Sequence, residues 1–215
     1  MSICIKMRLI SKLLSFVMHT TQKYCIDESH GLAHSMDVLH YANQIFELEK
    51  IRDFRLEKQE KIIYVSAIIH DMCDKKYMSE NDGLRNIEDF LQEKITKDET
   101  QIVKNIVSTM SYSTVKKNGF PTLNDYQSAY HIVREADLLS AYNFDRGMIF
   151  SMSVHGTDVE NAFLNTEKLF HSRMLRHIDD NLFITTTGKN IANKLELDAL
   201  LRMNSWKEIL DKHHL

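Results

Sequence analysis

The chain has 215 residues and a net charge of −3, which argues against the basic surface that nonspecific nucleic-acid binding needs. It contains one Pro and six Gly, both very few for this length. Because both residues break helices and populate turns, their scarcity predicts an all-α protein with short loops. Three Cys without paired spacing argue against a disulfide framework or a zinc knuckle and favour a reducing, cytoplasmic location.

The first helix is expected from about residue 3 to 24, a basic amphipathic stretch that an organelle-targeting peptide would also resemble. A polar loop over 27–31 leads to a second helix from about 32 to 50. A third is expected from about 56 to 72, with His70 and Asp71 at its end. Its apolar residues recur every three or four positions, as a single buried face requires: Ile62, Val65, Ile69 and Met72.

A fourth helix is expected over 86–95. Thr96 and Glu99 have the spacing of a capping box, which predicts that a fifth helix starts there and runs to about residue 110. Segment 111–122 holds the only Pro and is expected to be an irregular loop, of the kind that often serves function.

A sixth helix is expected over about 125–141, and two or three more reach residue 210. Nothing divides the chain into repeats or linkers. We therefore expect one domain over 1–215, with a core of about 27–142 and C-terminal helices of about 143–212 packed on it. No run of 18 apolar residues occurs, so no membrane partner is expected.

The adjacent pair His70 and Asp71 is the most informative feature of the sequence. Together with His34 and Asp137, on two other predicted helices, it offers two imidazoles and two carboxylates to one divalent metal. Such a ligand set leaves coordination positions for water and a substrate oxygen, which is typical of a catalytic site. Nitrogen and oxygen ligands suit manganese, iron, cobalt, nickel, zinc or magnesium, and affinity does not choose among them.

These residues resemble the metal tetrad of the HD-domain phosphohydrolases, and the chain looks most like the small bacterial nucleoside triphosphate pyrophosphohydrolases of that superfamily. The resemblance covers most of the chain, through residues 27–30 with His34, 66–76, 106–113 with 118–121, 132–139 and, faintly, 187–192. It implies an all-α HD-domain bundle with a metal between three helices. The chain departs from the family pattern at Gly31, Asp37, Leu138 and Ser140.

The activity implied by this resemblance is metal-dependent hydrolysis of a (d)NTP to the (d)NMP and pyrophosphate. One alternative is another HD phosphohydrolase, acting as a 5′-nucleotidase, a phosphodiesterase or a guanosine polyphosphate hydrolase. Another is a catalytically silent nucleotide-binding or interaction domain. The implied partner is a small nucleotide, with no nucleic acid and no membrane, and the protein is expected to be a monomer or homodimer.

Other residues extend the predicted site, each with a simpler alternative. Asp74, His30 and Lys75 are candidates for catalysis, against roles as a solvated helix end, a packing residue and a surface charge. Lys76, Arg134, Lys116 and Lys117 are candidates for phosphate binding, although Arg134 would also pair with Asp137 or Glu135. Cys73 is either a nucleophile or a buried thiol.

Overall fold

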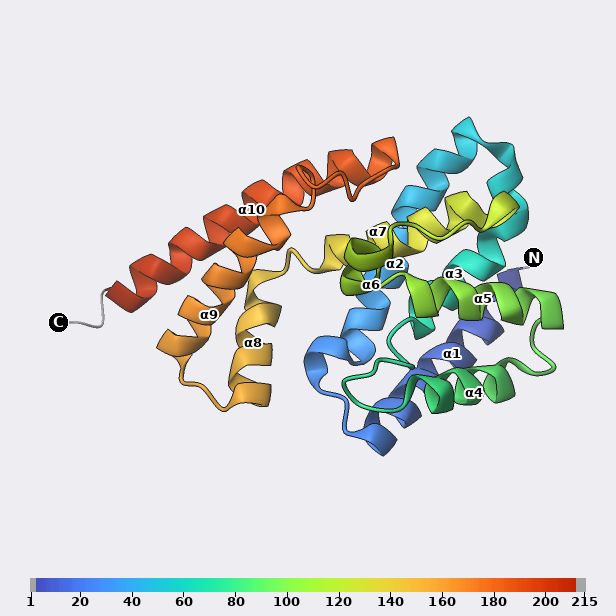
Figure 1. The fold of residues 1–215 in the computed structure, drawn as a ribbon, viewed down its shortest axis with the longest axis horizontal. Helices are drawn as coiled ribbons and strands as arrows, with labels where there is room; N and C mark the ends of the chain where they lie inside the picture. Colours follow the sequence, from blue (N-terminus) through green and yellow to red (C-terminus); the bar gives the residue numbers. More distant parts are fainter. Residues whose placement is uncertain (1–2, 212–215) are drawn as a thin grey trace.

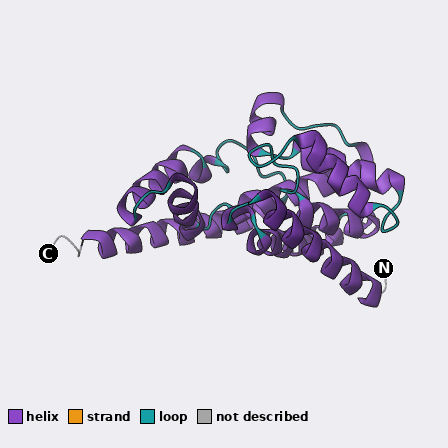
Figure 2. Ribbon diagram, turned by 90° about the horizontal axis from the view of Figure 1, so that it is seen from below, coloured by secondary structure: helices purple, strands orange, loops and turns teal. Residues whose placement is uncertain are grey.

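The computed structural model describes residues 3–211, which form ten α-helices and four short 3-10 helices without a strand, confirming the all-α prediction (Figures 1 and 2). The α-helices are α1 Ile3–Tyr24, α2 Leu32–Arg52, α3 Glu60–Ile69, α4 Glu80–Leu91, α5 Lys97–Thr109, α6 Tyr112–Asn118, α7 Gln127–Ser140, α8 Phe144–His155, α9 Val159–Ser172 and α10 Thr186–Asp211. The 3-10 helices are η1 Glu28–His30, η2 Phe54–Gln59, η3 Asn124–Tyr126 and η4 Met174–Arg176.

Helix α3 lies at the centre of the core and packs against α1, α2, α5 and α7. Residues 62–69 are therefore buried all round, not on one face as the apolar spacing predicted. The contacts of α2 with α3 and α7, and of α3 with α7, bring three helices together at one place. That arrangement determines where the candidate metal ligands meet.

The N-terminal stretch is a helix of this domain. Its bounds agree with the predicted range of 3 to 24, and the side chains of Leu13 and Val17 are completely buried in the core. The capping box at the start of α5 is also confirmed, because Glu99 N donates to Thr96 Oγ1 and Thr96 N donates to Glu99 Oε2.

Several predicted helix boundaries were wrong. The helix expected over 56–72 spans Glu60–Ile69, and His70 and Asp71 lie in the turn that follows. The helix expected over 86–95 is α4, Glu80–Leu91, and it includes Gly83 where the backbone approaches Cys73: a Cβ on Gly83 would lie 2.5 Å from Cys73 Cα.

Most of the segment expected to be irregular is helix α6. Ser111 begins this helix by accepting a hydrogen bond from Thr114 N, and Gly119 ends it with a φ of 74°. The irregular part is reduced to residues 119–123.

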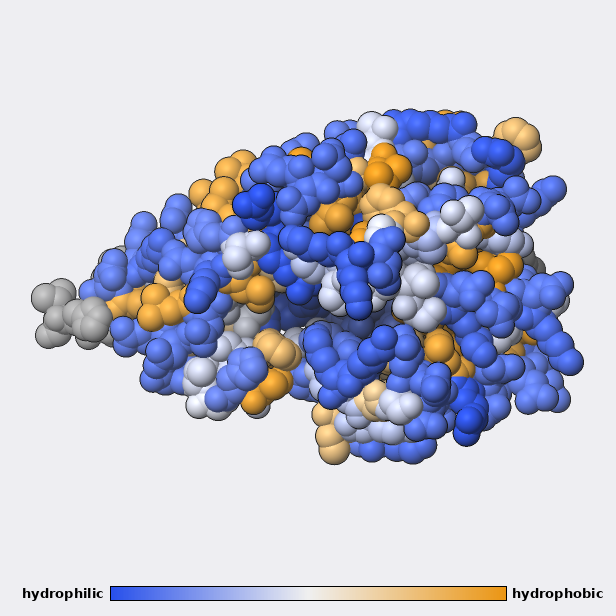
Figure 3. Space-filling model, in the orientation of Figure 1, coloured by the Kyte–Doolittle hydropathy of each residue, from blue (hydrophilic) through white to orange (hydrophobic). Residues whose placement is uncertain are grey.

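The C-terminal helices pack on the part of the chain that precedes them. Helix α8 contacts η1 and α9, and α10 contacts α2 and α7 (Figure 1). In the same orientation, the surface is hollowed between the part containing α8 and α9 and the part containing α1 to α6 (Figure 3).

Two glutamates of the core hold the start of α10. Glu135, completely buried on α7, accepts hydrogen bonds from Ile184 N at 2.6 Å and Thr185 N at 3.1 Å. Glu49 on α2 accepts from Thr187 N at 3.0 Å. The carboxylates satisfy backbone donors that a helix start would otherwise leave without partners. Gly188 permits this contact, since a Cβ there would lie 2.1 Å from Glu135 Oε2.

We expect Gly188→Ala to destabilise the fold, because the added methyl group forces the buried Glu135 carboxylate away from its donors. The unfolding free energy should fall by about 1–3 kcal/mol, or several degrees in Tm. Thermal unfolding followed by circular dichroism measures the change. Asn190→Ala, at an exposed position of the same helix, is the matched control, and equal melting of both variants would contradict the anchoring role of Glu135.

Candidate metal centre

Four predicted ligands meet where α2, α3 and α7 pack together. His34 comes from α2, His70 and Asp71 from the turn after α3, and Asp137 from α7. Because α3 has ended at Ile69, the backbone turns at His70, with Met72 N donating to Ile69 O at 3.0 Å. The two neighbouring side chains therefore reach the same point, although adjacent residues of a continuous helix would project about 100° apart.

The donor atoms of His34, His70 and Asp137 lie close enough together to share one cation, and Asp71 approaches the same two imidazoles. His34 Nε2 and His70 Nε2 lie 3.0 Å apart, and Asp71 Oδ2 lies 3.2 Å and 3.3 Å from them. Asp137 Oδ1 lies 3.5 Å and 3.6 Å from the same nitrogens. Two atoms each about 2.1 Å from an ion are separated by about 3.0 Å at an octahedral angle and about 3.4 Å at a tetrahedral one. The buried Asp71 Oδ2 has no hydrogen-bond partner among the described residues, as a ligand oxygen awaiting a metal would.

The hydrogen-bond partners of Nδ1 decide whether each imidazole can bind a metal through Nε2. His70 Nδ1 lies 2.9 Å from the Ala67 carbonyl oxygen, which accepts only from a protonated nitrogen. His34 Nδ1 lies 3.3 Å from Ser140 Oγ, whose own proton is donated to Asp137 O at 2.7 Å. A proton on Nδ1 of His70 leaves its Nε2 lone pair free to bind a metal. His34 Nδ1 also contacts Arg146 Nη1, which can only donate, so metal binding through His34 Nε2 requires the ring proton to move to Nδ1.

The two carboxylates of the cluster favour a positive charge between them. Burial opposes charging of His70, but the Asp71 and Asp137 carboxylates outweigh it and raise the pKa of His70 well above its usual value. Burial also opposes ionisation of the carboxyls, yet contacts with the imidazoles of His34 and His70 lower the pKa of both Asp71 and Asp137. Without a metal, a proton on His70 therefore takes the place of the cation.

A second group of predicted residues gathers at the edge of the cluster. His30 Nε2 lies 3.2 Å from Lys76 Nζ, and the His30 ring centroid is 6.1 Å from that of His34. Asp74 Oδ2 lies 3.7 Å from Lys76 Nζ, and Asp74 Oδ1 accepts a hydrogen bond from Lys76 N. Burial lowers the pKa of His30, although the nearby Asp71 raises it, so the His30 ring is neutral at pH 7.

The position of His30 is set by Asp27, a residue that sequence analysis assigned no role. Asp27 Oδ1 accepts from Ser29 Oγ at 2.5 Å, and Ser29 Oγ in turn lies 2.7 Å from His30 Nδ1. Tyr77 OH donates to the other oxygen of Asp27 and lies 3.2 Å from His30 Nδ1. The short polar loop before α2 therefore positions the His30 ring beside the cluster.

The structure does not bring the remaining predicted residues to the cluster. Lys75 points to Glu80, with Nζ 3.0 Å from Oε2. Arg134 is buried, donates to Leu182 O and pairs with Glu135, so its role is structural and the predicted phosphate clamp is not supported. Lys116 contacts Tyr112 OH and Asp180, and Lys117 is exposed.

Cys73 is a buried thiol. Its burial, reinforced by the negative charge of Asp71, raises the pKa of Cys73 to about 12. The thiol therefore stays protonated at neutral pH, which excludes an activated nucleophile.

Three residues near the cluster were not predicted from the sequence to belong to the site. Arg146 on α8 contacts His34 Nδ1. Arg173, between α9 and η4, and His177, just after η4, both lie close enough to Asp137 to feel its charge. None of the three has a spacing relative to the tetrad that could have pointed to it, because the C-terminal helices bring them in by tertiary packing.

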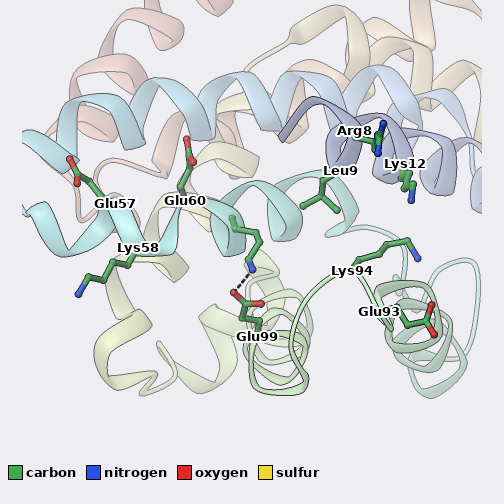
Figure 4. A pocket seen from close by; sticks show the side chains of 10 residues that line it. Arg8, Leu9, Lys12, Glu57, Lys58, Glu60, Glu93, Lys94 and Glu99 are labelled. Atoms are coloured by element: carbon green, nitrogen blue, oxygen red, sulfur yellow. Dashed lines mark ion pairs between the residues drawn. The ribbon is translucent and has the colours of Figure 1, made fainter. Parts of the chain in front are cut away.

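The hollow drawn in Figure 4 lies elsewhere, against α1, η2 and the start of α5. Charged side chains of both signs line it, and the Glu99 carboxylate there pairs with Lys61 at 2.6 Å. It contains no residue of the tetrad, and its balanced charges do not select a ligand.

Comparison with known proteins shows the fold alone. The sequence matches no protein-family model and no curated protein. The structure is similar to the crystal structure of a structural-genomics target from Lactobacillus plantarum, with a TM-score of 0.67 and 15% sequence identity over 94% of this chain and 97% of that one. None of the helices within residues 3–211 is both long and apolar enough to cross a membrane.

We expect the purified protein to hold one divalent ion per chain, and Asp137→Ala to lose it, because that change removes one of two charge-balancing ligands. Elemental analysis of protein prepared without chelator measures the content. Asp89→Ala, at an exposed position on α4, is the control for loss of an aspartate. An unaltered metal content in Asp137→Ala would rule out this ligand set.

Metal affinity should rise with pH. In the metal-free protein the raised pKa of His70 keeps its ring protonated at neutral pH, whereas Asp71 and Asp137, whose pKa values are lowered, are already ionised. A metal must displace the His70 proton, so affinity should increase about tenfold per pH unit until the pKa of His70 is reached. Titration calorimetry in buffers of different ionisation enthalpy counts the protons released, and a count of zero would contradict the assignment.

Proposed function

We propose that the protein is a metal-dependent phosphohydrolase that acts on nucleotides and cleaves a (d)NTP to the (d)NMP and pyrophosphate. The observation that carries the proposal is the cluster of His34, His70 and Asp137, whose imidazoles also lie 3.2 and 3.3 Å from Asp71, beside the group formed by His30, Asp74 and Lys76. The choice of a triphosphate is supported by the resemblance of the sequence to the HD-domain pyrophosphohydrolases.

The four ligands would hold a divalent cation. When bound, such an ion polarises a phosphoryl oxygen and makes a water more acidic. Asp137 has 28% of its side chain exposed and Asp71 has 15%, so solvent and substrate can approach the cluster at its carboxylates. The two histidines are each only 2% exposed.

Asp74, Lys76 and His30 complete the chemistry at this open side. As water attacks the α-phosphorus, a new oxygen–phosphorus bond forms and the bond to the bridging oxygen breaks, so that pyrophosphate departs. Asp74 takes the proton of the attacking water, a contribution typically worth about 10² to 10⁴ in rate. Lys76, with 57% of its side chain exposed, is free to contact a phosphate oxygen. The neutral His30 accepts a hydrogen bond from Lys76 Nζ and so orients it.

Product analysis tests the proposal. Metal-loaded protein should convert a nucleoside triphosphate into monophosphate and pyrophosphate, and phosphorus NMR distinguishes these products from diphosphate and orthophosphate. In ¹⁸O-labelled water, the label should enter the monophosphate, because the attack is at the α-phosphorus. Orthophosphate as the first product, or activity on monophosphates only, would favour the alternative phosphohydrolases.

In the same assay Asp74→Asn should lower kcat by about 10² to 10⁴ and leave the metal content unchanged, because it removes acid–base capacity without removing a ligand. Lys76→Gln should weaken turnover, whereas Lys75→Gln, one residue earlier and paired with Glu80, should not. Full activity of Asp74→Asn would mean that Asp74 is only a solvated turn residue.

A further inference from the structure

Two guanidinium groups beside the metal cluster have no ionic partner. Among the residues that the structure describes, neither Arg146 nor Arg173 has a carboxylate oxygen within 4.0 Å, whereas Arg134 nearby pairs with Glu135. Nε of Arg173 is also buried without a hydrogen-bond partner. Groups of this kind are costly to bury unless they are paired.

The surroundings of Arg173 hold it in place without neutralising it. Its guanidinium lies 4.1 Å from the centroid of the Tyr112 ring, which stabilises a cation through its face. The same ring stands 5.5 Å from the ring of His177. His177 is completely buried and neither of its ring nitrogens has a partner in the described chain, so a second set of unsatisfied donors and acceptors adjoins Arg173.

Arg146 lies beside His34, and its Nη1 donates a hydrogen bond to His34 Nδ1. Metal binding through Nε2 requires the other tautomer, which carries its proton on Nδ1, 3.3 Å from Ser140 Oγ. In that tautomer Arg146 has no acceptor on His34. Its donors are then available to another acceptor at the same place.

The charges at the centre do not offset these two cations. With a divalent ion bound, the carboxylates of Asp71 and Asp137 cancel the charge of the metal, and the imidazoles of His34 and His70 are neutral. The two guanidiniums then leave an excess of two positive charges. This excess suits an anion with at least two negative charges that extends beyond the phosphoryl group at the metal.

We propose that Arg146 and Arg173, with His177 behind them, form a subsite for the pyrophosphate part of an oligophosphate substrate. This inference rests on the proposed function and narrows it, because a monophosphate has no group to place there. The subsite belongs to the C-terminal helices and the metal cluster to the core helices, so substrate with several phosphates bridges the two parts of the molecule.

Direct binding tests the subsite without relying on turnover. Calorimetric titration of inorganic pyrophosphate and of orthophosphate into the metal-loaded protein, at the same free metal concentration, should show tighter binding of pyrophosphate. Arg173→Gln and Arg146→Gln should each weaken pyrophosphate binding about 10- to 100-fold and change orthophosphate binding much less. Arg173→Lys keeps the positive charge and should recover part of the loss.

Arg176→Gln is the matched control, because Arg176 lies on the adjacent turn, has 58% of its side chain exposed and already pairs with Asp180. Thermal unfolding verifies that each variant is folded. If Arg173→Gln and Arg146→Gln both bind pyrophosphate as tightly as the parent, the subsite is wrong. If pyrophosphate binding depends on both arginines but no nucleoside triphosphate is hydrolysed, the subsite stands and the proposed function fails.

Discussion

Two buried imidazoles, from His34 and His70, lie within 3.6 Å of the partly exposed carboxylates of Asp71 and Asp137, and this constraint governs the architecture around them. Asp71 and Asp137 would repel each other there unless a positive charge lay between them. A proton on His70, whose pKa is raised, would supply that charge, and so would a divalent ion at the candidate site. Because the four ligands come from α2, the end of α3 and α7, this charge balance also stabilises the packing of the three helices that form the core.

Helix α7 serves the core and the C-terminal helices at once. Asp137 faces the cluster, whereas Glu135, two residues earlier and therefore about 200° round the helix, faces the start of α10. The hydrogen bonds of Glu135 to Ile184 and Thr185 fasten the segment that follows η4. The same segment follows Arg173 and His177 in the chain. A single helix therefore connects the candidate metal cluster to the residues of the inferred anion subsite.

The adjacent residues Lys75 and Lys76 illustrate which parts of the site can be predicted from sequence. The sequence made both lysines candidates for the site, because each closely follows the His70–Asp71 pair. The turn after α3 directs Lys75 toward Glu80 and Lys76 toward His30 and Asp74. Arg134 was a similar case, because its proximity to Asp137 in sequence suggested a substrate contact, whereas its side chain is buried against Leu182 and Glu135. Proximity along the chain does not decide the direction of a side chain at the end of a helix or in a core.

The sequence by itself determined the helical class, the capped start of α5 and the grouping of His34, His70 and Asp137, with Asp71 beside the two imidazoles. Those features depend on local rules: the scarcity of Gly and Pro, the spacing of a capping box, and the pairing of His and Asp in a known order. Tertiary structure alone decided that α3 stops before His70, that Gly83 lies inside α4, and that Arg146, Arg173 and His177 lie beside the ligands. Each of these depends on contacts between segments that are far apart in the chain. Such contacts produce no regular spacing of residue types, so they cannot be predicted from a sequence pattern.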